Sequence, residues 1–406
     1  MIQPCYLLTI VLWVFLYSSG LALDTITAGD RPDMPIRIGM SGPFSGPTKS
    51  DGFKIKMGIE AYFERVNSQG GVHGRLLELI TLDDAYNPEL ARANMIRLID
   101  RDHVLAIAGN IGTPTARATV PIANEKKTLL FGAFSGAALL RRSPPDRYII
   151  NYRASYAQET AAMVNALLDQ GIRPFEIAFF TQKDGYGDSG YQGAIEALSS
   201  AGFPHIDHLV HARYESYDMD ITDGLFAILE APVKPKAIIM VGTYQPSARF
   251  IRMVKRSLQD ILFLNVSLVG STSLANLLGD QETGVIVTQV VPHFESDIPI
   301  AREFLKDLKE YFPKSSPGFV SFEGYIIARI LVEGCIRAGS DLNRESLINT
   351  IEKLSDFDLQ MGIPVHFTPD SHQGSRSVWP TMLHNGRFLP INWSELIQRT
   401  RDRESP

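Results

Sequence analysis

The stretch VLAIAGNIGTPTARATVPIANEKKTLLFGAFSG, residues 104–136, decides the fold. It predicts an apolar strand over 104–108, a helix over 114–125 and a second strand over 128–131. A continuous apolar strand is typical of a parallel sheet that is covered on both faces. Because strand–helix–strand is the parallel βαβ unit, both strands are expected to end at the same edge of one sheet.

The same alternation extends in both directions along the chain. Before this stretch, strands are predicted over 36–40 and 76–82, with helices over 53–67 and 88–100. A second series begins near residue 151, with strands over 176–180, 206–212, 237–241, 261–265 and 284–291 and helices over 156–169, 190–201, 221–230 and 246–257. The tail changes to helices over 298–312, 319–338 and 344–354, then short β segments over 365–367 and 378–383.

Two successive series predict an α/β fold of two doubly wound parallel-sheet lobes. We expect lobe 1 to comprise residues 35–152 and 292–363, and lobe 2 to comprise 153–291 and 364–398. The lobes are then joined by a multi-strand hinge with crossovers near 152, 291 and 364. In sheets of this kind, ligands bind at the carboxyl ends of the strands.

Composition excludes several classes of partner. The chain has 406 residues, 45% hydrophobic and 21% charged, with a formal net charge of -6 and no basic block. Nucleic acid and anionic membrane surfaces are therefore not expected as partners. We also expect a monomer.

The first residues are typical of an export signal. Residues 6–17 are an almost unbroken apolar run, too short to span a bilayer, followed by the small residues Gly20 and Ala22. We predict a signal peptide over 1–22 and a periplasmic mature protein; an uncleaved anchor is the alternative. Cys5 lies in this signal, so Cys335 cannot form an internal disulfide in the mature chain.

Hydroxyl residues follow the two strands of the opening stretch. Thr113, before Pro114, is suited to cap the helix over 114–125, and Ser135 is suited to cap a following helix. Two helix N-termini on one sheet edge would form an anion site. The alternative interpretation is helix capping alone.

Glycines in the second series match a dinucleotide-binding pattern. Gly185, Gly187 and Gly190 form GxGxxG, and Asp207 follows at a suitable distance. Residues 181–184 separate the strand from the first glycine, which departs from the fingerprint. An NAD-dependent oxidoreductase is thus a weaker alternative, and no cofactor is expected.

No metal site and no catalytic residue are predicted. His205, His208 and His211 fall in a segment that reads as a strand, where alternate side chains point to opposite faces. Three histidines spaced in this way do not converge on one metal ion. The chain also has no GxSxG, Walker A or HExxH pattern.

Several motifs, in order, resemble a known family. They are IGMSGPFSGP at 38–47, NSQGGVHG at 67–74, DDAYNP at 83–88, DGYG at 184–187, VVP at 290–292 and FEGY at 322–325. Together they resemble the type I periplasmic solute-binding proteins of ABC importers, in the group that binds leucine, isoleucine and valine. The resemblance covers nearly the whole mature chain and implies a cleft between two lobes that closes on a small ligand.

The resemblance also implies site residues. Thr113 matches the hydroxyl residue that holds the ligand carboxylate, and Ser135 and Gly136 lie in the second carboxylate-binding loop. The full set of implied ligand-binding residues is Phe44, Ser45, Thr113, Ser135, Gly136, Asp184, Tyr186, Tyr244 and Ser271.

Three positions depart from the family pattern. Gly136 stands where a hydroxyl is usual, and Asp51 stands at an aromatic roof position. Gly270, Ser271 and Thr272 lack the acid that pairs with an amino acid's ammonium. A buried unpaired ammonium is costly, so Asp51 or Asp184 would have to serve, or the ligand has no free amine.

The function expected from the resemblance is capture of a small amino acid, carboxylate, amide or urea-type solute for an ABC permease. An exported receptor that signals to a separate membrane sensor is the alternative. The sequence does not separate these two roles.

Overall fold

Local signals set the ends of several helices. Helix α2 (Pro88–Asp100) begins where predicted because the Asn87 side chain accepts hydrogen bonds from the N–H groups of Glu89 and Leu90. Helix α4 (Tyr156–Asp169) also begins where predicted, with a capping box between Ser155 and Gln158. In both helices the cap satisfies backbone N–H groups that have no partner within the helix.

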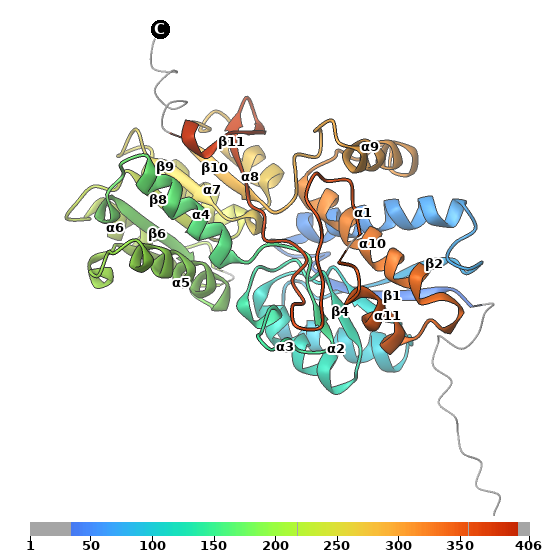
Figure 1. Ribbon diagram of the computed structural model, residues 1–406. Coiled ribbons are helices and arrows are strands. Elements are labelled where there is room, and N and C mark those ends of the chain that lie inside the picture. The colour runs from blue at the N-terminus through green and yellow to red at the C-terminus, as the bar shows by residue number, and fades with distance from the viewer. Residues whose placement is uncertain (1–33, 217, 356, 397–406) are drawn as a thin grey trace, which may run out of the picture.

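The computed structural model describes residues 34–396 except 217 and 356, and within them the chain forms two α/β lobes (Figure 1). The predicted signal peptide, residues 1–22, lies outside the described residues. None of the described helices is long and apolar enough to cross a membrane.

The first lobe contains a five-stranded parallel sheet in the order β2-β1-β3-β4-β5. Its strands are β1 (Ile36–Gly42), β2 (Leu77–Asp83), β3 (Ala106–Ala108), β4 (Leu129–Phe131) and β5 (Ile149–Ile150). Alternate strand residues enter two hydrophobic cores: Ile107 packs with α2 and α3, whereas Ala106 and Ala108 face the other core. This burial on both faces explains why the strands are continuously apolar.

Helices from two parts of the chain cover this sheet. They are α1 (Lys49–Ser68), α2 and α3 (Thr113–Glu125) from the first part, and α9 (Pro299–Tyr311), α10 (Phe319–Ala338) and α11 (Arg344–Ile351) from the tail. Figure 1 shows α10, in orange, lying along α1, in blue. The tail helices therefore complete the first lobe.

The second lobe contains a seven-stranded sheet in the order β12-β11-β10-β9-β8-β6-β7. Its strands are β6 (Ile177–Gln182), β7 (His211–Tyr214), β8 (Ala237–Val241), β9 (Leu262–Asn265), β10 (Val285–Gln289), β11 (Trp379–His384) and β12 (Arg387–Pro390). Strands β6 to β10 pair in parallel, and β11 and β12 add an antiparallel edge next to β10. The helices of this lobe are α4, α5 (Gly185–Ser200), α6 (Thr222–Leu229), α7 (Tyr244–Val254) and α8 (Ser271–Leu278).

Three chain segments pass between the lobes, and they are hydrogen-bonded to one another. The Tyr152 hydroxyl donates to the carbonyl of Val290 at 3.3 Å, and the N–H of Ser375 donates to the carbonyl of Tyr152 at 2.7 Å. Phe367 packs against Phe131 of β4, with ring centroids 6.3 Å apart. The third segment thus stays with the first lobe beyond residue 364 and meets the first segment at 373–375.

Several predicted elements were wrong. Residues 206–212 are not one strand: Ile206–His208 is a 3-10 turn, and β7 begins only at His211. Residues 365–367 form no strand, while α8, β5 and β12 were not predicted. These are short segments, whose periodicity is too brief to distinguish them from loops.

Candidate functional site

The carboxyl ends of the two sheets face each other, and the lobes are in contact there. The Tyr244 hydroxyl, on α7 of the second lobe, donates to the carbonyl of Pro47 on the first. Ser273 Oγ, on α8, lies 3.0 Å from Ser50 Oγ on α1. The structure therefore has the cleft between the lobes closed.

Thr113 and Ser135 meet at the carboxyl edge of the first sheet. Thr113 follows β3 and Ser135 follows β4, and these two strands are parallel neighbours. Their hydroxyl oxygens lie 2.8 Å apart, and both side chains are buried. A Cβ added to Gly185 would lie 3.6 Å from Thr113 Cγ2, so Thr113 faces the second lobe.

The capping predicted for these two residues was wrong. Gly112 is the N-cap of α3, with φ of 99°, and Thr113 is its first helical residue. Only glycine adopts this φ without strain, and a Cβ there would lie 2.3 Å from the Tyr86 ring. Ser135 is followed by a single 3-10 turn, Ala138–Leu140. The edge therefore presents one α-helix N-terminus here instead of two.

Tyrosines surround the hydroxyl pair. The Tyr156 hydroxyl lies 3.5 Å from Ser135 Oγ, and the Tyr156 and Tyr186 rings have centroids 5.0 Å apart. The Tyr186 hydroxyl donates to the carbonyl of Gly242 at 3.2 Å. Burial raises the pKa of both phenols, so both stay protonated and serve as hydrogen-bond donors. Sequence reasoning missed Tyr156, although it follows directly on the capping residue Ser155.

Gly136 is explained by the approach of Tyr156. A Cβ on Gly136 would lie 2.6 Å from the backbone nitrogen of Tyr156 and 2.5 Å from its ring. No side chain fits at this position, so the hydroxyl that is usual in the family has no room. The neighbouring loop is held by Arg141, which donates to the carbonyls of Ser135 and Ala137 at 3.1 and 2.8 Å.

Asp184 is the N-cap of α5. Its carboxylate accepts hydrogen bonds from the N–H of Tyr186 at 2.8 Å, Gln182 Nε2 at 2.6 Å and Ser216 Oγ at 2.7 Å. These bonds occupy both carboxylate oxygens. Asp184 is therefore committed to holding the start of α5 and leaves little capacity for a ligand ammonium.

Two of the three GxGxxG glycines, Gly187 and Gly190, are required by packing. A Cβ on Gly187 would lie 1.9 Å from the carbonyl oxygen of Gln182, and a Cβ on Gly190 would lie 2.5 Å from Val241. Close approach of α5 to β6 and β8 accounts for these two glycines without a nucleotide.

Phe44 and Ser45 lie in a loop whose backbone is held by hydrogen bonds to the Asp83 side chain. Asp83 Oδ1 accepts the N–H groups of Phe44 at 2.8 Å and Ser45 at 3.2 Å. Although burial raises the pKa of Asp83, hydrogen bonds from this loop lower it overall. Phe44 is half-buried against Phe53, whereas Ser45 is exposed. These hydrogen bonds fix the backbone of the loop without a ligand, and the Phe44 side chain packs against the hydrophobic core.

Asp51 and Ser271 lie on opposite sides of the closed cleft. Ser271, the first residue of α8, is buried, and its Oγ accepts a hydrogen bond from Gln289 at 2.8 Å. Asp51, in the first turn of α1, is 3% exposed, and burial raises the pKa of its carboxyl to about 7. Among the described residues, nothing donates a hydrogen bond to Asp51 Oδ1.

A water-sized cavity lies between the closed lobes. A cavity of about 30 Å³ lies between Thr48 and Tyr86 of the first lobe and Gln182, Tyr214 and Thr243 of the second. This is roughly the volume of one water molecule.

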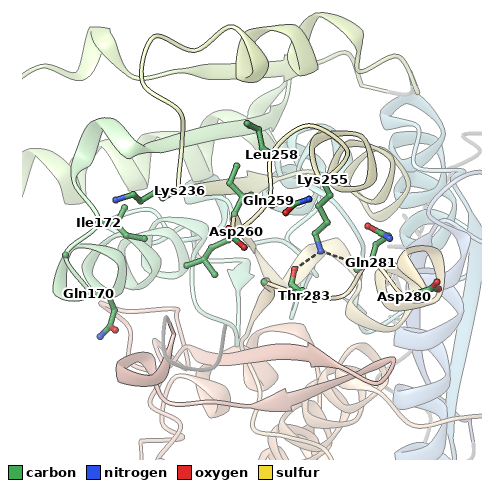
Figure 2. Close-up of a pocket in the computed structure, with 14 residues that line it drawn as sticks. Gln170, Ile172, Lys236, Lys255, Leu258, Gln259, Asp260, Asp280, Gln281 and Thr283 are labelled. Atoms are coloured by element: carbon green, nitrogen blue, oxygen red, sulfur yellow. Dashed lines mark hydrogen bonds between the residues drawn. The ribbon is translucent and has the colours of Figure 1, made fainter. Parts of the chain in front are cut away.

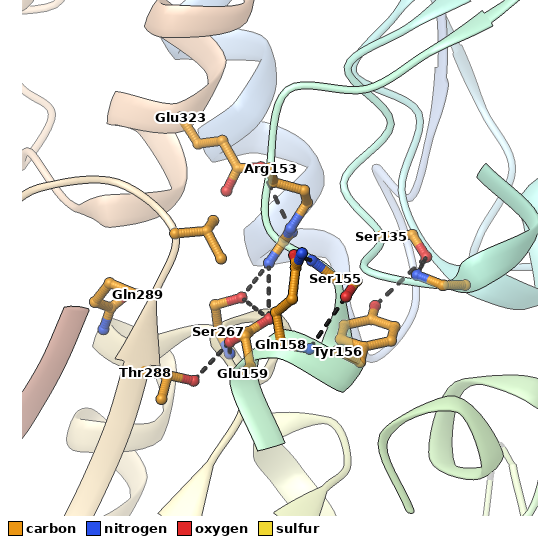
Figure 3. A network of polar contacts seen from close by, with 12 residues as sticks. Ser135, Arg153, Ser155, Tyr156, Gln158, Glu159, Ser267, Thr288, Gln289 and Glu323 are labelled. Carbon is orange, nitrogen blue, oxygen red and sulfur yellow. Dashed lines mark hydrogen bonds and ion pairs between the residues drawn. The ribbon is translucent and has the colours of Figure 1, made fainter. Parts of the chain in front are cut away.

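A buried charged network around Arg153 lies near Ser135 and Tyr156 (Figure 3). Arg153 is fully buried and lies 3.7 Å from Glu159 of the second lobe and 3.5 Å from Glu323 of the first. Its guanidinium also contacts Ser267 and lies 4.5 Å from the Phe134 ring centroid. Burial opposes the charged form, but Glu323 and Glu159 raise the pKa of Arg153 overall. Arg153 thus joins both lobes at the base of the cleft.

A larger cavity, of about 800 Å³, lies elsewhere on the second lobe (Figure 2). It is bordered by Ile172, Lys236, Leu262 and Gly284, which precede or begin strands, so it opens at the amino ends of the sheet. Lys255 donates there to two backbone carbonyls, at 2.6 and 2.8 Å. This cavity is at the opposite edge from the cleft and shares none of its residues.

No metal cluster occurs among the described residues: no group of three or more His, Cys, Asp or Glu could hold an ion. His211 stacks on Tyr191 at 3.8 Å, and its Nε2 lies 2.8 Å from Thr181 Oγ1. Cys335 is buried among apolar side chains, which raises its pKa to about 12. Neither residue is suited to a metal ion or to nucleophilic chemistry.

A sequence profile of the periplasmic binding protein family matches residues 35–387. The chain belongs to the periplasmic binding protein family. This binding protein is 41% identical to a possible leucine/isoleucine/valine-binding protein from Rhodopirellula baltica, whose crystal structure superposes with a TM-score of 0.85 over 92% of this chain and 100% of that one.

Two further relatives are more distant. The leucine-, isoleucine-, valine-, threonine- and alanine-binding protein of Pseudomonas aeruginosa is 23% identical over 307 residues, 75% of this chain and 79% of that protein. A fatty acid ABC transporter substrate-binding protein from Thermomonospora curvata is 21% identical, with a TM-score of 0.79 over 90% of this chain and 94% of that one, a likeness of fold alone.

These comparisons confirm the resemblance and the fold that the sequence predicted. The chain is a type I periplasmic binding protein of the branched-chain amino acid group, with two parallel-sheet lobes. Its general role is to bind a solute.

Proposed function

We propose that this binding protein captures a small polar solute between its lobes in the periplasm and delivers it to an ABC importer. The Thr113–Ser135 pair carries this proposal. Two hydroxyls 2.8 Å apart, buried at the carboxyl edge of one lobe and facing the other, suit a carboxylate or carbonyl oxygen. The relatives' reported ligands, branched-chain and small amino acids, have such a group.

Capture follows from the arrangement of the two lobes. Thr113 and Ser135 come from the first lobe, while Tyr186 and Tyr244 come from the second. A solute that contacts both sets stabilises the closed arrangement over an open one by its difference in affinity for the two. The crossover segments at Tyr152 and Val290, which are hydrogen-bonded to each other, would act as a hinge about which the lobes rotate as rigid bodies.

The site is suited to binding rather than to catalysis. Tyr156 and Tyr186 have raised pKa values and donate hydrogen bonds, so neither is a base at neutral pH. Close packing accounts for Gly187 and Gly190, two of the three glycines on which a nucleotide site would rest.

A thermal-shift screen tests the proposal. The mature protein is heated with amino acids, carboxylates, amides and NAD, each at a high concentration. A ligand at about 100 times its Kd adds roughly 2.7 kcal/mol, which raises Tm by several degrees. A shift with NAD and none with the small solutes would reject the proposal.

A further inference from the structure

Lys255 lies on the wall of the cavity of about 800 Å³ at the amino ends of the second sheet (Figure 2). It follows the last residue of α7 and is half-buried. Its Nζ donates to the carbonyls of Gln281 at 2.8 Å and Thr283 at 2.6 Å, and lies 5.7 Å from the centroid of the Phe263 ring. These contacts hold the amine in one place at the side of the cavity.

The neutral form of this amine fits its surroundings. Burial lowers the pKa of Lys255 to about 8, although the Glu282 carboxylate opposes the shift. A neutral amine has two N–H groups, which match the carbonyls of Gln281 and Thr283, and one lone pair, which then points away from both. Partly buried lysines with this property act as nucleophiles in proteins.

The cavity wall carries charges of both signs. Lys236 and Lys255 are balanced by Asp260 and Asp280, so the wall favours neither an anion nor a cation. The Lys236 ammonium is already paired with the Glu176 carboxylate, at 2.9 Å. Cavities of about 300–1,000 Å³ are typical of sites for small molecules. A small uncharged molecule is therefore the occupant that suits this cavity.

An uncharged occupant and a fixed amine together match carbonyl chemistry. The lone pair of Nζ forms a bond to the carbonyl carbon of an aldehyde. The two hydrogens of the neutral amine then leave with the carbonyl oxygen as water, and a C=N bond remains. The step needs no oxidant or reductant, and addition of water reverses it.

We propose that Lys255 is a covalent capture site, at which a small uncharged aldehyde forms an imine with Nζ inside this cavity. The site is separate from the cleft and does not depend on the proposed solute binding. After the step Nζ keeps at most one hydrogen, so at least one of the bonds to Gln281 and Thr283 is lost. The turn between α8 and β10, which contains both carbonyls, is then held less tightly.

Reductive labelling tests this assignment. The intact mature protein is treated at pH 7 with glyceraldehyde and cyanoborohydride, which reduces an imine to a stable amine, and peptide mass spectrometry measures the labelling of each lysine. A pKa of about 8 gives Lys255 roughly 300 times the neutral fraction of a lysine at its usual value of 10.5. Because nucleophilicity falls with basicity, we expect labelling about 10-fold faster than at exposed lysines.

Lys236 is the matched control lysine. It borders the same cavity, but its side chain is 60% exposed and is paired with Glu176. Lys255→Arg keeps the charge and the ability to donate to the two carbonyls, and should abolish the fast labelling. Lys236→Arg should leave it unchanged. An aldehyde attached to a dextran polymer is too large to enter the cavity, and should label Lys255 no faster than Lys236.

Two results would overturn the inference. The first is labelling by glyceraldehyde that is no faster at Lys255 than at Lys236. The second is the same preference for Lys255 with the aldehyde on dextran, because the cavity would then play no part. Should Lys255→Arg not fold, the comparison of the two lysines within the natural chain decides. Each of these results leaves solute capture in the cleft unaffected.

Discussion

The hydroxyl of Thr113 lies 2.8 Å from that of Ser135, although the two residues belong to different βα units. Each hydroxyl can donate one proton, and in the closed protein they share one hydrogen bond. A ligand oxygen placed between them would replace that shared bond with two bonds of its own. This relationship explains why a buried site can remain polar before a ligand binds.

Removing the Thr113 hydroxyl is expected to weaken ligand binding. Thr113→Val keeps the shape of the side chain and should lower affinity about 10- to 100-fold, as for a hydrogen bond to a charged group. Thr119→Val is the matched control, because Thr119 is buried on the same helix and its hydroxyl donates to the carbonyl of Ala116 within that helix. Calorimetry would show equal affinities for both variants if Thr113 were not in the site.

Loss of the Tyr244 hydroxyl should affect the closed state. In Tyr244→Phe the ring remains, but the hydrogen bond to the Pro47 carbonyl on the other lobe is lost. We expect affinity to fall about 2- to 10-fold, with faster dissociation, because one interlobe bond contributes about 0.5–1.5 kcal/mol. Tyr311→Phe, whose hydroxyl bonds Ser68 within the first lobe, should leave stopped-flow dissociation rates unchanged.

A methyl group on Gly187 should destabilise the second lobe. The added Cβ would lie 1.9 Å from the backbone oxygen of Gln182, which cannot move without distorting β6. We expect Gly187→Ala to lower the free energy of unfolding by about 1–3 kcal/mol or more in thermal melts. Gly185→Ala, with its nearest neighbour at 3.6 Å, is the control, and an equal loss in both variants would contradict the packing explanation.

The ion pairs of the buried Arg153 with Glu159 and Glu323 predict that substitutions of these residues have coupled effects on stability. Arg153→Met leaves Glu159 and Glu323 without their cation and should destabilise the protein by about 3–5 kcal/mol. Glu159 keeps hydrogen bonds from Thr288 and the Ser267 backbone. Glu323 loses its ion pair with Arg153 and keeps the weaker attraction of Arg141. Adding Glu323→Gln to Arg153→Met should therefore restore part of the loss in urea denaturation. Strictly additive effects of the two substitutions would argue against the ion pair.

Stability should depend on pH through buried carboxyls. Burial raises the pKa of Asp51 and of Glu323 to about 7 and that of Asp84 to about 6. A carboxyl with a raised pKa in the folded state is most favourable when protonated, so its contribution is fully present below about pH 4 and is lost as pH rises through 6 to 7. Other groups oppose this at very low pH, which places the expected maximum on the acid side of neutrality.

Urea denaturation between pH 5 and 8 measures this dependence. Lys54 and Tyr244 also face Asp51. Burial raises the pKa of Tyr244 to about 12, well above this window. Burial lowers the pKa of Lys54, and the Asp51 carboxylate opposes that shift. Asp51→Asn should flatten the decline between pH 5 and 7, and Glu323→Gln should remove a separate part of it. A natural protein whose stability rises from pH 5 to 7 would contradict the assignment.

Repeated strand and helix patterns, read from the sequence, predicted both lobes and most of their elements. Periods of two and 3.6 residues and local caps such as Asn87 depend on neighbours in the chain, so they can be read without a structure. The hydroxyls of Thr113 and Ser135 could be placed at one sheet edge for the same reason, because parallel neighbouring strands end together.

Contacts between distant segments needed the folded chain. Thr113 is not a cap, Gly136 is a glycine because Tyr156 approaches it, and Asp184 is occupied by its own helix. Asp51 and Gly270 looked like unrelated departures from the family pattern, yet they lie against each other across the cleft. Periodicity does not encode such a pairing, because it depends on how two separately folded lobes close, which is set by packing and long-range hydrogen bonds.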